Sequence, residues 1–295
     1  MADTDDPDRI ALEPGLVRLR APNPSPMTER GTNSYLLGED ALCIIDPGPD
    51  MAGHLAALLA EIGGRPVEAI IVTHAHRDHS ALAPALARQV GAPILAFGDA
   101  QSGRSAAMRR LAGRIGGGEG VDAAFTPDRT LQDGASLEGP GWRLEALHTP
   151  GHMGNHLCLE WNGCLFTGDL VMGWASTLVS PPDGDVSQFV ASCERLRARA
   201  ARRLFPGHGA PIDDAAARID WLIAHRRDRE RQILAALRAG TADAGALTRA
   251  LYSDVAPSLH PAAMRNVIAH LVDLENRNLV ASDDADPLRA SFSLT

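Results

Sequence analysis

The chain has 295 residues, of which 45% are hydrophobic, and its formal net charge is −9 at pH 7. This length allows one large domain or two smaller ones, and no apolar run approaches the roughly 18 residues that a membrane span needs. All 28 basic residues are arginine, so a lysine nucleophile is excluded, and the acidic balance disfavours a general nucleic-acid binder.

Strand signals dominate the first half of the chain. Short apolar stretches predict strands at residues 16–19, 35–37, 42–45, 70–72 and 94–97. Apolar residues at helical spacing predict one helix between Asp50 and Gly63 and another from His79 to Gln89. The stretch at residues 98–120 is rich in arginine and glycine. It has two interpretations, a helix with a flexible loop beside the functional site or a plain connection.

A second set of strands follows at residues 131–147 and 157–169, and residues 187–201 have helical spacing. Two strand-rich parts, each followed by helices, predict an α/β (α+β) fold in four layers. In this αββα sandwich, two sheets pack face to face between outer helices, and functional residues gather on loops at one edge. We assign the sandwich to residues 1–217.

Beyond the sandwich the pattern changes. After one long helical stretch, two shorter helices are predicted at residues 246–251 and 261–274. Two short β-like runs at residues 278–281 and 290–294 then predict a hairpin. We therefore interpret residues 218–295 as a small winged-helix-like domain.

The cysteines show no CxxC spacing; they are Cys43, Cys158, Cys164 and Cys193. We expect them to be small core residues in a reducing compartment. The acidic residues 1–6 contain no apolar signal segment. These features predict a cytoplasmic protein with no membrane partner.

The strongest chemical signal is the segment at residues 74–79, His-Ala-His-Arg-Asp-His. The apolar run at residues 70–72 leads into it, as a buried strand delivers ligands to the loop at its end. Imidazole nitrogens and carboxylates are ligands that zinc, iron and manganese accept. A lone histidine would be an ordinary surface or core residue, but three histidines and an aspartate at this spacing predict a metal site.

Three further candidates lie downstream next to glycines, namely His152, Asp169 and His208. Pro-Gly-His and Gly-Asp are ordinary turn sequences when each is taken alone. Together with residues 74–79, and in this order, they resemble the metallo-β-lactamase-fold hydrolases. That family carries His-x-His-x-Asp-His, followed by a histidine, an aspartate and another histidine.

The resemblance implies two adjacent metal ions and assigns each candidate a place. The first ion would be held by His74, His76 and His152. The second ion would be held by Asp78, His79 and His208. Asp169 would bridge both ions, so Asp78 and Asp169 are the catalytic candidates. Asp46 would support the ligand histidines from behind.

Within this family the chain is most similar to the β-lactamase-like protein 2 group, which adds a C-terminal winged-helix-like domain. The similarity includes residues 31–36, which form a first-hairpin strand in the family, and residues 44–48. It continues from residue 225 to residue 274. The resemblance covers nearly the whole chain and implies a metallo-β-lactamase sandwich for the first domain.

Two zinc ions about 3.5–4 Å apart can share a water and lower its pKa from about 15.7 toward neutrality, so that a bridging hydroxide acts as the nucleophile. Iron or manganese are accepted by the same ligands. Such a centre suits phosphodiesters, thioesters, esters and lactones alike. The ligands alone therefore do not name the substrate.

Three functions compete. The group resemblance implies an endoribonuclease that cleaves single-stranded RNA. The alternative is a hydrolase of a small-molecule thioester or ester, like glyoxalase II, or of a lactone. A third function, from another class, is a nucleic-acid-binding regulatory protein with structural metal. Charge argues against the third, because nine arginines stand against ten acidic residues from Ile219 onward. A homodimer is compatible with the sequence, which does not indicate the oligomeric state.

Candidate substrate contacts lie near the ligands. His148 and His156 flank one ligand candidate and are candidates for substrate contact or proton transfer; the alternative is a strand histidine bonded to the backbone. Trp174, Ser176 and Thr177 follow the bridging candidate, and they have two interpretations: they line the substrate cleft, or they have a loop role without substrate contact. The arginines at residues 226–231 alternate with acids, which favours a solvated helix face over an RNA-contacting strip.

Overall fold

The computed structural model describes residues 7–118 and 120–295. The acidic residues 1–6, which carried part of the localisation prediction, lie outside the described residues. Within the described ranges, no helix is both long enough and apolar enough to cross a membrane.

The first sheet has seven strands, and their order in space follows the chain. The strands are β1 (Arg9–Glu13), β2 (Leu16–Arg20), β3 (Asn33–Leu37), β4 (Leu42–Ile45), β5 (Val67–Ile71), β6 (Ile94–Ala96) and β7 (Arg129–Thr130). Pairing is antiparallel from β1 to β4 and parallel from β4 to β7. Successive side chains of a strand point to opposite faces, so Tyr35 and Leu37 enter one core while Leu36 enters another.

The second sheet has five strands in the order β12-β11-β10-β9-β8. They are β8 (Ser136–Gly139), β9 (Trp142–His148), β10 (Leu157–Trp161), β11 (Cys164–Gly168) and β12 (Arg203–Pro206). Only β11 and β12 pair in parallel among these strands. Ile45 and Ile71 of the first sheet share a buried core with Leu159 and Phe166 of the second. The two sheets therefore pack face to face.

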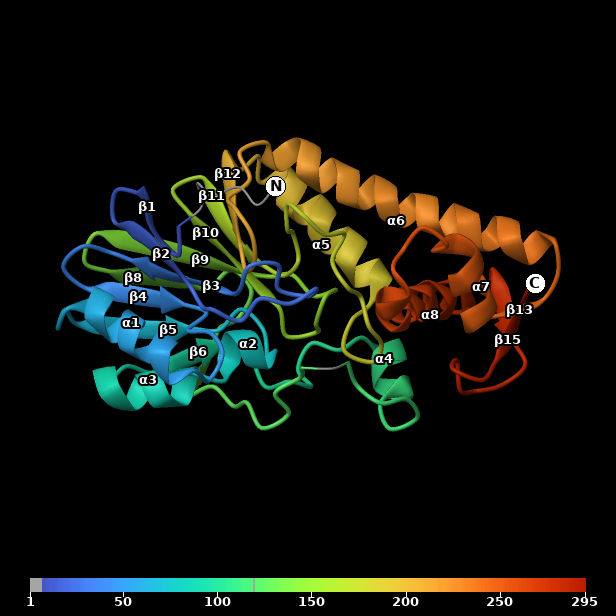
Figure 1. The fold of residues 1–295 in the computed structure, drawn as a ribbon, viewed down its shortest axis with the longest axis horizontal. Coiled ribbons are helices and arrows are strands. Elements are labelled where there is room, and N and C mark those ends of the chain that lie inside the picture. The colour runs from blue at the N-terminus through green and yellow to red at the C-terminus, as the bar shows by residue number, and fades with distance from the viewer. Residues whose placement is uncertain (1–6, 119) are drawn as a thin grey trace.

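Helices cover the outer face of each sheet (Figure 1). On the first sheet, α1 (Ala52–Ile62) and α3 (Ala83–Val90) bury Leu58 and Leu86. On the second sheet, α5 (Val186–Ala198) buries Phe189. The predicted αββα arrangement is confirmed. So is the glycine stop of α1, where Gly63 adopts a left-handed φ of 59° and donates its N–H to the carbonyl of Leu59.

The 24-residue helix α6 (Ala215–Arg238) links the sandwich to the C-terminal part, and Figure 1 shows it running along both. Its first half places Ile219 in the core under the second sheet, and its second half places Ile233 in the C-terminal core. One helix thus belongs to two cores. The division after residue 217 stays a prediction, and it would fall inside the first turn of α6.

The C-terminal part contains α7 (Ala244–Leu251), the short 3-10 helix η1 (Pro257–Leu259) and α8 (His260–Asn276). A three-stranded sheet follows the order β13 (Ala242–Asp243), β15 (Ser291–Leu294), β14 (Val280–Ser282). The antiparallel pairing of β14 with β15 confirms the predicted hairpin. Of the two interpretations of residues 98–120, the one with a helix is confirmed, because α4 (Ala106–Leu111) inserts Met108 into the C-terminal core.

All four cysteines are buried and free, as predicted for core residues. Cys43 and Cys164 lie in the core between the sheets, and Cys158 and Cys193 lie in the core beneath α5. Burial raises the pKa of the Cys158 and Cys193 thiols to about 12. Such thiols are poor nucleophiles at neutral pH.

Candidate metal centre

The candidate ligands lie on loops that follow strands of both sheets. The loop after β5 carries His74 and His76, and it continues into α2 (Arg77–Ser80), which carries Asp78 and His79. His152 lies between β9 and β10, Asp169 follows β11, and His208 follows β12. All of them gather into two neighbouring clusters of side chains that are suited to binding two metal ions.

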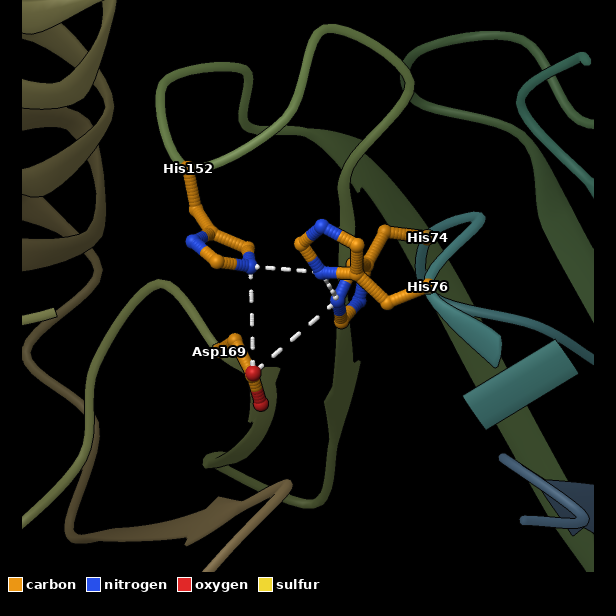
Figure 2. A group of neighbouring side chains, drawn as sticks. All are labelled: His74, His76, His152 and Asp169. Carbon is orange, nitrogen blue, oxygen red and sulfur yellow. Dashed lines mark hydrogen bonds and ion pairs between the residues drawn. The ribbon is translucent and has the colours of Figure 1, made fainter. Parts of the chain in front are cut away.

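The first cluster consists of His74, His76, His152 and Asp169 (Figure 2). The Nδ1 atom of His76 lies 2.9 Å from Nε2 of His74 and 3.0 Å from Nε2 of His152. The Oδ2 atom of Asp169 lies 3.9 Å from Nε2 of His74 and 3.7 Å from Nε2 of His152. Three ring nitrogens and one carboxylate oxygen therefore converge on one point.

The second cluster consists of Asp78, His79 and His208. The Nε2 atoms of the two histidines lie 3.3 Å apart. The Oδ2 atom of Asp78 lies 3.5 Å from Nε2 of His79 and 3.2 Å from Nε2 of His208. Thr32 donates its hydroxyl hydrogen to the same oxygen at 3.1 Å, which fixes the carboxylate of Asp78.

Asp169 joins the two clusters. Its Oδ2 atom faces the first cluster and lies 3.3 Å from Nε2 of His208, while its Oδ1 atom lies 3.3 Å from Nε2 of His79. Oδ1 is buried and accepts no hydrogen bond from a described residue. Gly207 makes room for it, since a Cβ atom there would lie 2.4 Å from Oδ1. A buried oxygen of this kind needs a cation or a proton.

The outward nitrogens of the histidines are held by oxygen atoms. Nδ1 of His152 donates to the Leu178 carbonyl at 2.7 Å, and Nδ1 of His208 donates to the Gly31 carbonyl at 3.2 Å. The pKa of His152 is lowered by burial, so its neutral ring carries one hydrogen on Nδ1 and the inward Nε2 atom keeps its lone pair. This arrangement is typical of metal-ligating histidines, and it shows that these residues fit a metal ion.

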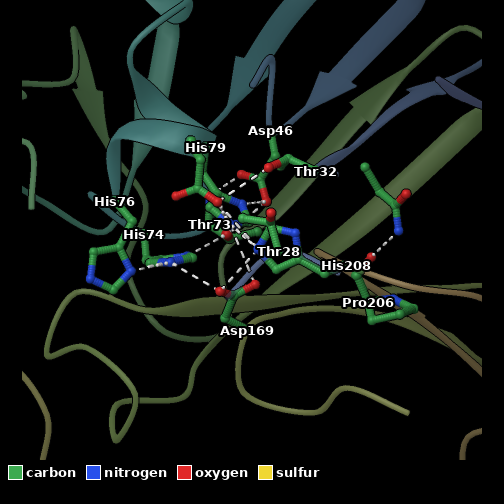
Figure 3. A network of polar contacts seen from close by, with 12 residues as sticks. Thr28, Thr32, Asp46, Thr73, His74, His76, His79, Asp169, Pro206 and His208 are labelled. Atoms are coloured by element: carbon green, nitrogen blue, oxygen red, sulfur yellow. Dashed lines mark hydrogen bonds and ion pairs between the residues drawn. The ribbon is translucent and has the colours of Figure 1, made fainter. Parts of the chain in front are cut away.

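Asp46 lies behind the histidines, where it was predicted (Figure 3). Its Oδ2 atom accepts from Nδ1 of His79 at 2.8 Å and from the Thr73 hydroxyl at 2.8 Å. The Thr73 hydroxyl in turn accepts from Nδ1 of His74 at 3.0 Å. The backbone N–H of Thr73 donates to Oδ1 of Asp46 at 2.7 Å. One buried carboxylate therefore orients a histidine in each cluster.

The pKa values of the histidines shift in opposite directions in the two clusters. Burial lowers the pKa of His76 to about 3 and lowers that of His152. Burial alone would also lower the pKa of His208, but the charge of Asp169 raises it to about 9. The pKa of His79 is raised well above its usual value because Asp78 and Asp169 outweigh the effect of burial.

The predicted substrate contacts lie at different depths. His148 donates to the Gly154 carbonyl at 2.8 Å and stacks on Phe97, which fits the backbone-bonded alternative. His156 is fully buried, and its Nε2 atom accepts from the backbone N–H of Asp169 at 3.2 Å. Thr177 is buried and donates to the Asp169 carbonyl at 3.0 Å. Trp174 is 38% exposed and lies close to Gly209.

Sequence reasoning missed the Leu178 carbonyl and misplaced Arg226. Every residue has a carbonyl, so no sequence signal distinguishes the one that bonds to His152. Arg226 was expected on a solvated helix face, but its side chain is 2% exposed. Arg227 and Arg231 do form ion pairs, with Glu194 and Asp228. The error at Arg226 arose because its neighbours alternate in charge as an exposed face does.

Both parts of the chain match known protein families. Residues 27–208 match the metallo-beta-lactamase superfamily, and residues 244–287 match the beta-lactamase associated winged helix domain. A beta-lactamase-like protein 2 homolog of Drosophila melanogaster is 30% identical over 290 residues, covering 93% of each chain. An atrochrysone carboxyl ACP thioesterase of Aspergillus fumigatus is 31% identical over 243 residues, covering 79% of this chain and 68% of that protein.

A solved structure extends the similarity to the whole chain. A metallo-beta-lactamase family protein from Thermus thermophilus superimposes with a TM-score of 0.76 and 28% identity. The match covers 97% of this chain and 100% of that one. The sandwich and the C-terminal domain therefore occur together in a protein of known structure.

Proposed function

Because the chain belongs to the metallo-β-lactamase superfamily and is a metal-dependent hydrolase, we propose that it cleaves a small-molecule thioester or ester with two zinc ions. The observation that carries the proposal is Asp169, whose two oxygens lie within 3.3 Å of ring nitrogens of His79 and His208 while Oδ2 also faces the first cluster. A carboxylate between two ligand sets is the feature that a dinuclear hydrolytic centre requires.

The ligand roles follow from the clusters. His74, His76 and His152 would hold one ion, Asp78, His79 and His208 the other, and Asp169 both. When bound, two ions lower the pKa of water and polarise the substrate carbonyl. Protein residues would orient the ligands, because Asp46 bonds to His79 and Thr32 bonds to Asp78. The ligand histidines His74, His79 and His208 are buried, which excludes bulk water from their rings.

Two observations support a neutral acyl substrate. Several fungal relatives that are 29–32% identical to this chain are named as thioesterases. Beside His208, a Cβ atom on Gly209 would lie 2.9 Å from the Trp174 ring and 2.8 Å from the Glu29 carboxylate. An indole and an acid therefore lie beside the residue that follows His208, whereas phosphate binding recruits basic residues.

A second candidate is cleavage of single-stranded RNA. It is favoured by the similarity to the beta-lactamase-like protein 2 homolog, which spans both domains and covers 93% of each chain. The sequence resemblance to that group implies the RNA substrate. An RNA substrate requires contacts to phosphate, whereas an acyl substrate does not. The two substrates are therefore tested side by side.

The test measures thiol release from acetyl-, hexanoyl- and benzoyl-pantetheine by zinc-loaded protein, in parallel with cleavage of a labelled single-stranded RNA. We expect thioester hydrolysis by the wild type and by the matched His260→Ala variant, and none by His76→Ala. RNA should stay intact. RNA cleavage that requires His76, with no thiol release, would refute the acyl substrate and show that the substrate is RNA.

A further inference from the structure

The loop at residues 172–179 connects the metal centre to the C-terminal helices. The Leu178 carbonyl accepts from Nδ1 of His152 at 2.7 Å. The preceding residue, Thr177, has a left-handed φ of 65° and donates its hydroxyl to the Asp169 carbonyl at 3.0 Å. The position of this loop therefore sets the ring of one candidate ligand and the backbone of another.

Arg226 of α6 holds this loop through its carbonyl groups. Its Nη2 atom donates to the Ser176 carbonyl at 2.6 Å and also to the Thr177 carbonyl. Arg226 is 2% exposed, and its guanidinium lies over the Phe189 ring at 4.8 Å from the ring centroid. The planar guanidinium uses one nitrogen for both carbonyls and keeps Nη1 for a further acceptor, a division that a single amine in its place would not reproduce.

Asn266 of α8 completes the contact. Its Oδ1 atom accepts from Nη1 of Arg226 at 3.1 Å and from the backbone N–H of Val179 at 3.0 Å. Residues on both sides of Leu178 are thus bonded to the two C-terminal helices. The carbonyl of Leu178 has little freedom to turn away from His152 while these bonds persist.

We propose that Arg226 and Asn266 are positioning residues for the first metal cluster. They hold the Leu178 carbonyl where it keeps the hydrogen of His152 on Nδ1 and leaves Nε2 free to bind a metal ion. The C-terminal domain thereby completes the metal centre without contributing a ligand. This inference rests on the proposed two-metal hydrolase, but it concerns metal binding and can be tested without substrate.

Asn266 offers a matched pair of variants. Asn266→Leu removes the acceptor at similar volume, and Asn266→Asp keeps it. Arg226→Gln shortens the arm that reaches the loop. Arg218→Gln is the control, because Arg218 of the same helix bonds the same loop at the Met172 and Ala175 carbonyls, away from Leu178.

The measurements are stepwise zinc affinity by chelator competition and the ¹⁵N shifts of His152 in metal-free protein. Loss of a hydrogen-bond partner behind a ligand typically weakens metal binding about 10- to 100-fold. We expect that loss for one of two ions in Asn266→Leu and Arg226→Gln, together with loss of the Nδ1–H tautomer of His152. Asn266→Asp and Arg218→Gln should keep both ions and the tautomer.

Unchanged affinity and tautomer in Asn266→Leu would overturn the inference. Equal weakening of both ions, accompanied by a lower Tm, would also overturn it, since that pattern indicates a general structural role. Thioester hydrolysis is measured separately. A wild type that binds two ions in the expected way but cleaves no thioester would refute the proposed substrate and leave the positioning role intact.

Discussion

The two clusters of the metal centre both consist mostly of buried side chains but differ in charge. The first gathers three imidazoles around one carboxylate, whereas the second sets two imidazoles against Asp78, Asp169 and Asp46. The pKa of His76 falls to about 3 through burial, while that of His208 rises to about 9 despite burial, because of Asp169. The number of carboxylates therefore decides the direction of the shift, and burial alone does not.

This difference predicts two kinds of metal binding. In the first cluster the neutral rings already present lone pairs at neutral pH. In the second cluster, protons on His79 and His208 balance the carboxylates until a cation replaces them. The groups that orient the ligand histidines also differ between the clusters. His79 is held by the side chain of Asp46, whereas His152 is held by the backbone of a loop that two C-terminal helices fix.

The largest effect should come from removing the one residue that the clusters share. Asp169→Ala should lower metal occupancy at both and reduce kcat by on the order of 10³-fold, since bound metal supplies several kcal/mol of transition-state stabilisation. Metal content and initial rates test this, with the exposed Asp213→Ala as control. Circular dichroism should show an intact fold. Full activity of Asp169→Ala would refute the bridging role.

The candidate ligands at residues 74–79 could be recognised from the sequence because their information is local. Residues 74–79 follow a buried strand, and the remaining candidates each follow a strand or turn that ends at the same place. Sheet pairing brings such loops together, but the choice of His152, Asp169 and His208 among ordinary turn sequences came from the family resemblance.

Among the groups that bond to the candidate ligands from behind, the sequence predicted a side chain but no backbone group. The family resemblance placed Asp46 behind the histidines, and its carboxylate does accept from His79 and Thr73. The Leu178 carbonyl was not, because its role depends on the path of a loop. Arg226 was misplaced, because helical charge alternation does not reveal which turn of α6 faces the loop.

A smaller and one-sided effect should follow from Asp46→Asn. The amide keeps one acceptor oxygen, whereas the carboxylate accepts from the Thr73 N–H, the Thr73 hydroxyl and His79. We expect zinc binding at the second cluster to weaken about 10- to 100-fold, with a lesser change at the first. Stepwise zinc titration measures both, and the exposed Asp50→Asn serves as control. Equal losses at both clusters would show that Asp46 does not act chiefly through His79.

The smallest effect is a difference in pH dependence between the clusters. Metal binding requires deprotonated ligands, so a histidine with a pKa of about 9 opposes binding more strongly as pH falls below that value. His208 should therefore contribute about a tenfold rise in zinc affinity at the second cluster between pH 7 and pH 8, and the raised pKa of His79 should make the slope steeper still.

At the first cluster, His76 has a pKa of about 3 and should contribute no slope over the same interval. Zinc affinity measured by chelator competition at pH 6.5, 7, 7.5 and 8 separates the two steps. Calorimetry in buffers of different ionisation enthalpy counts the protons released with each ion. Because zinc itself hydrolyses as pH rises, the comparison uses the difference between the two steps within one titration. Parallel slopes for both ions would mean that the carboxylates of the second cluster do not hold protons on its histidines.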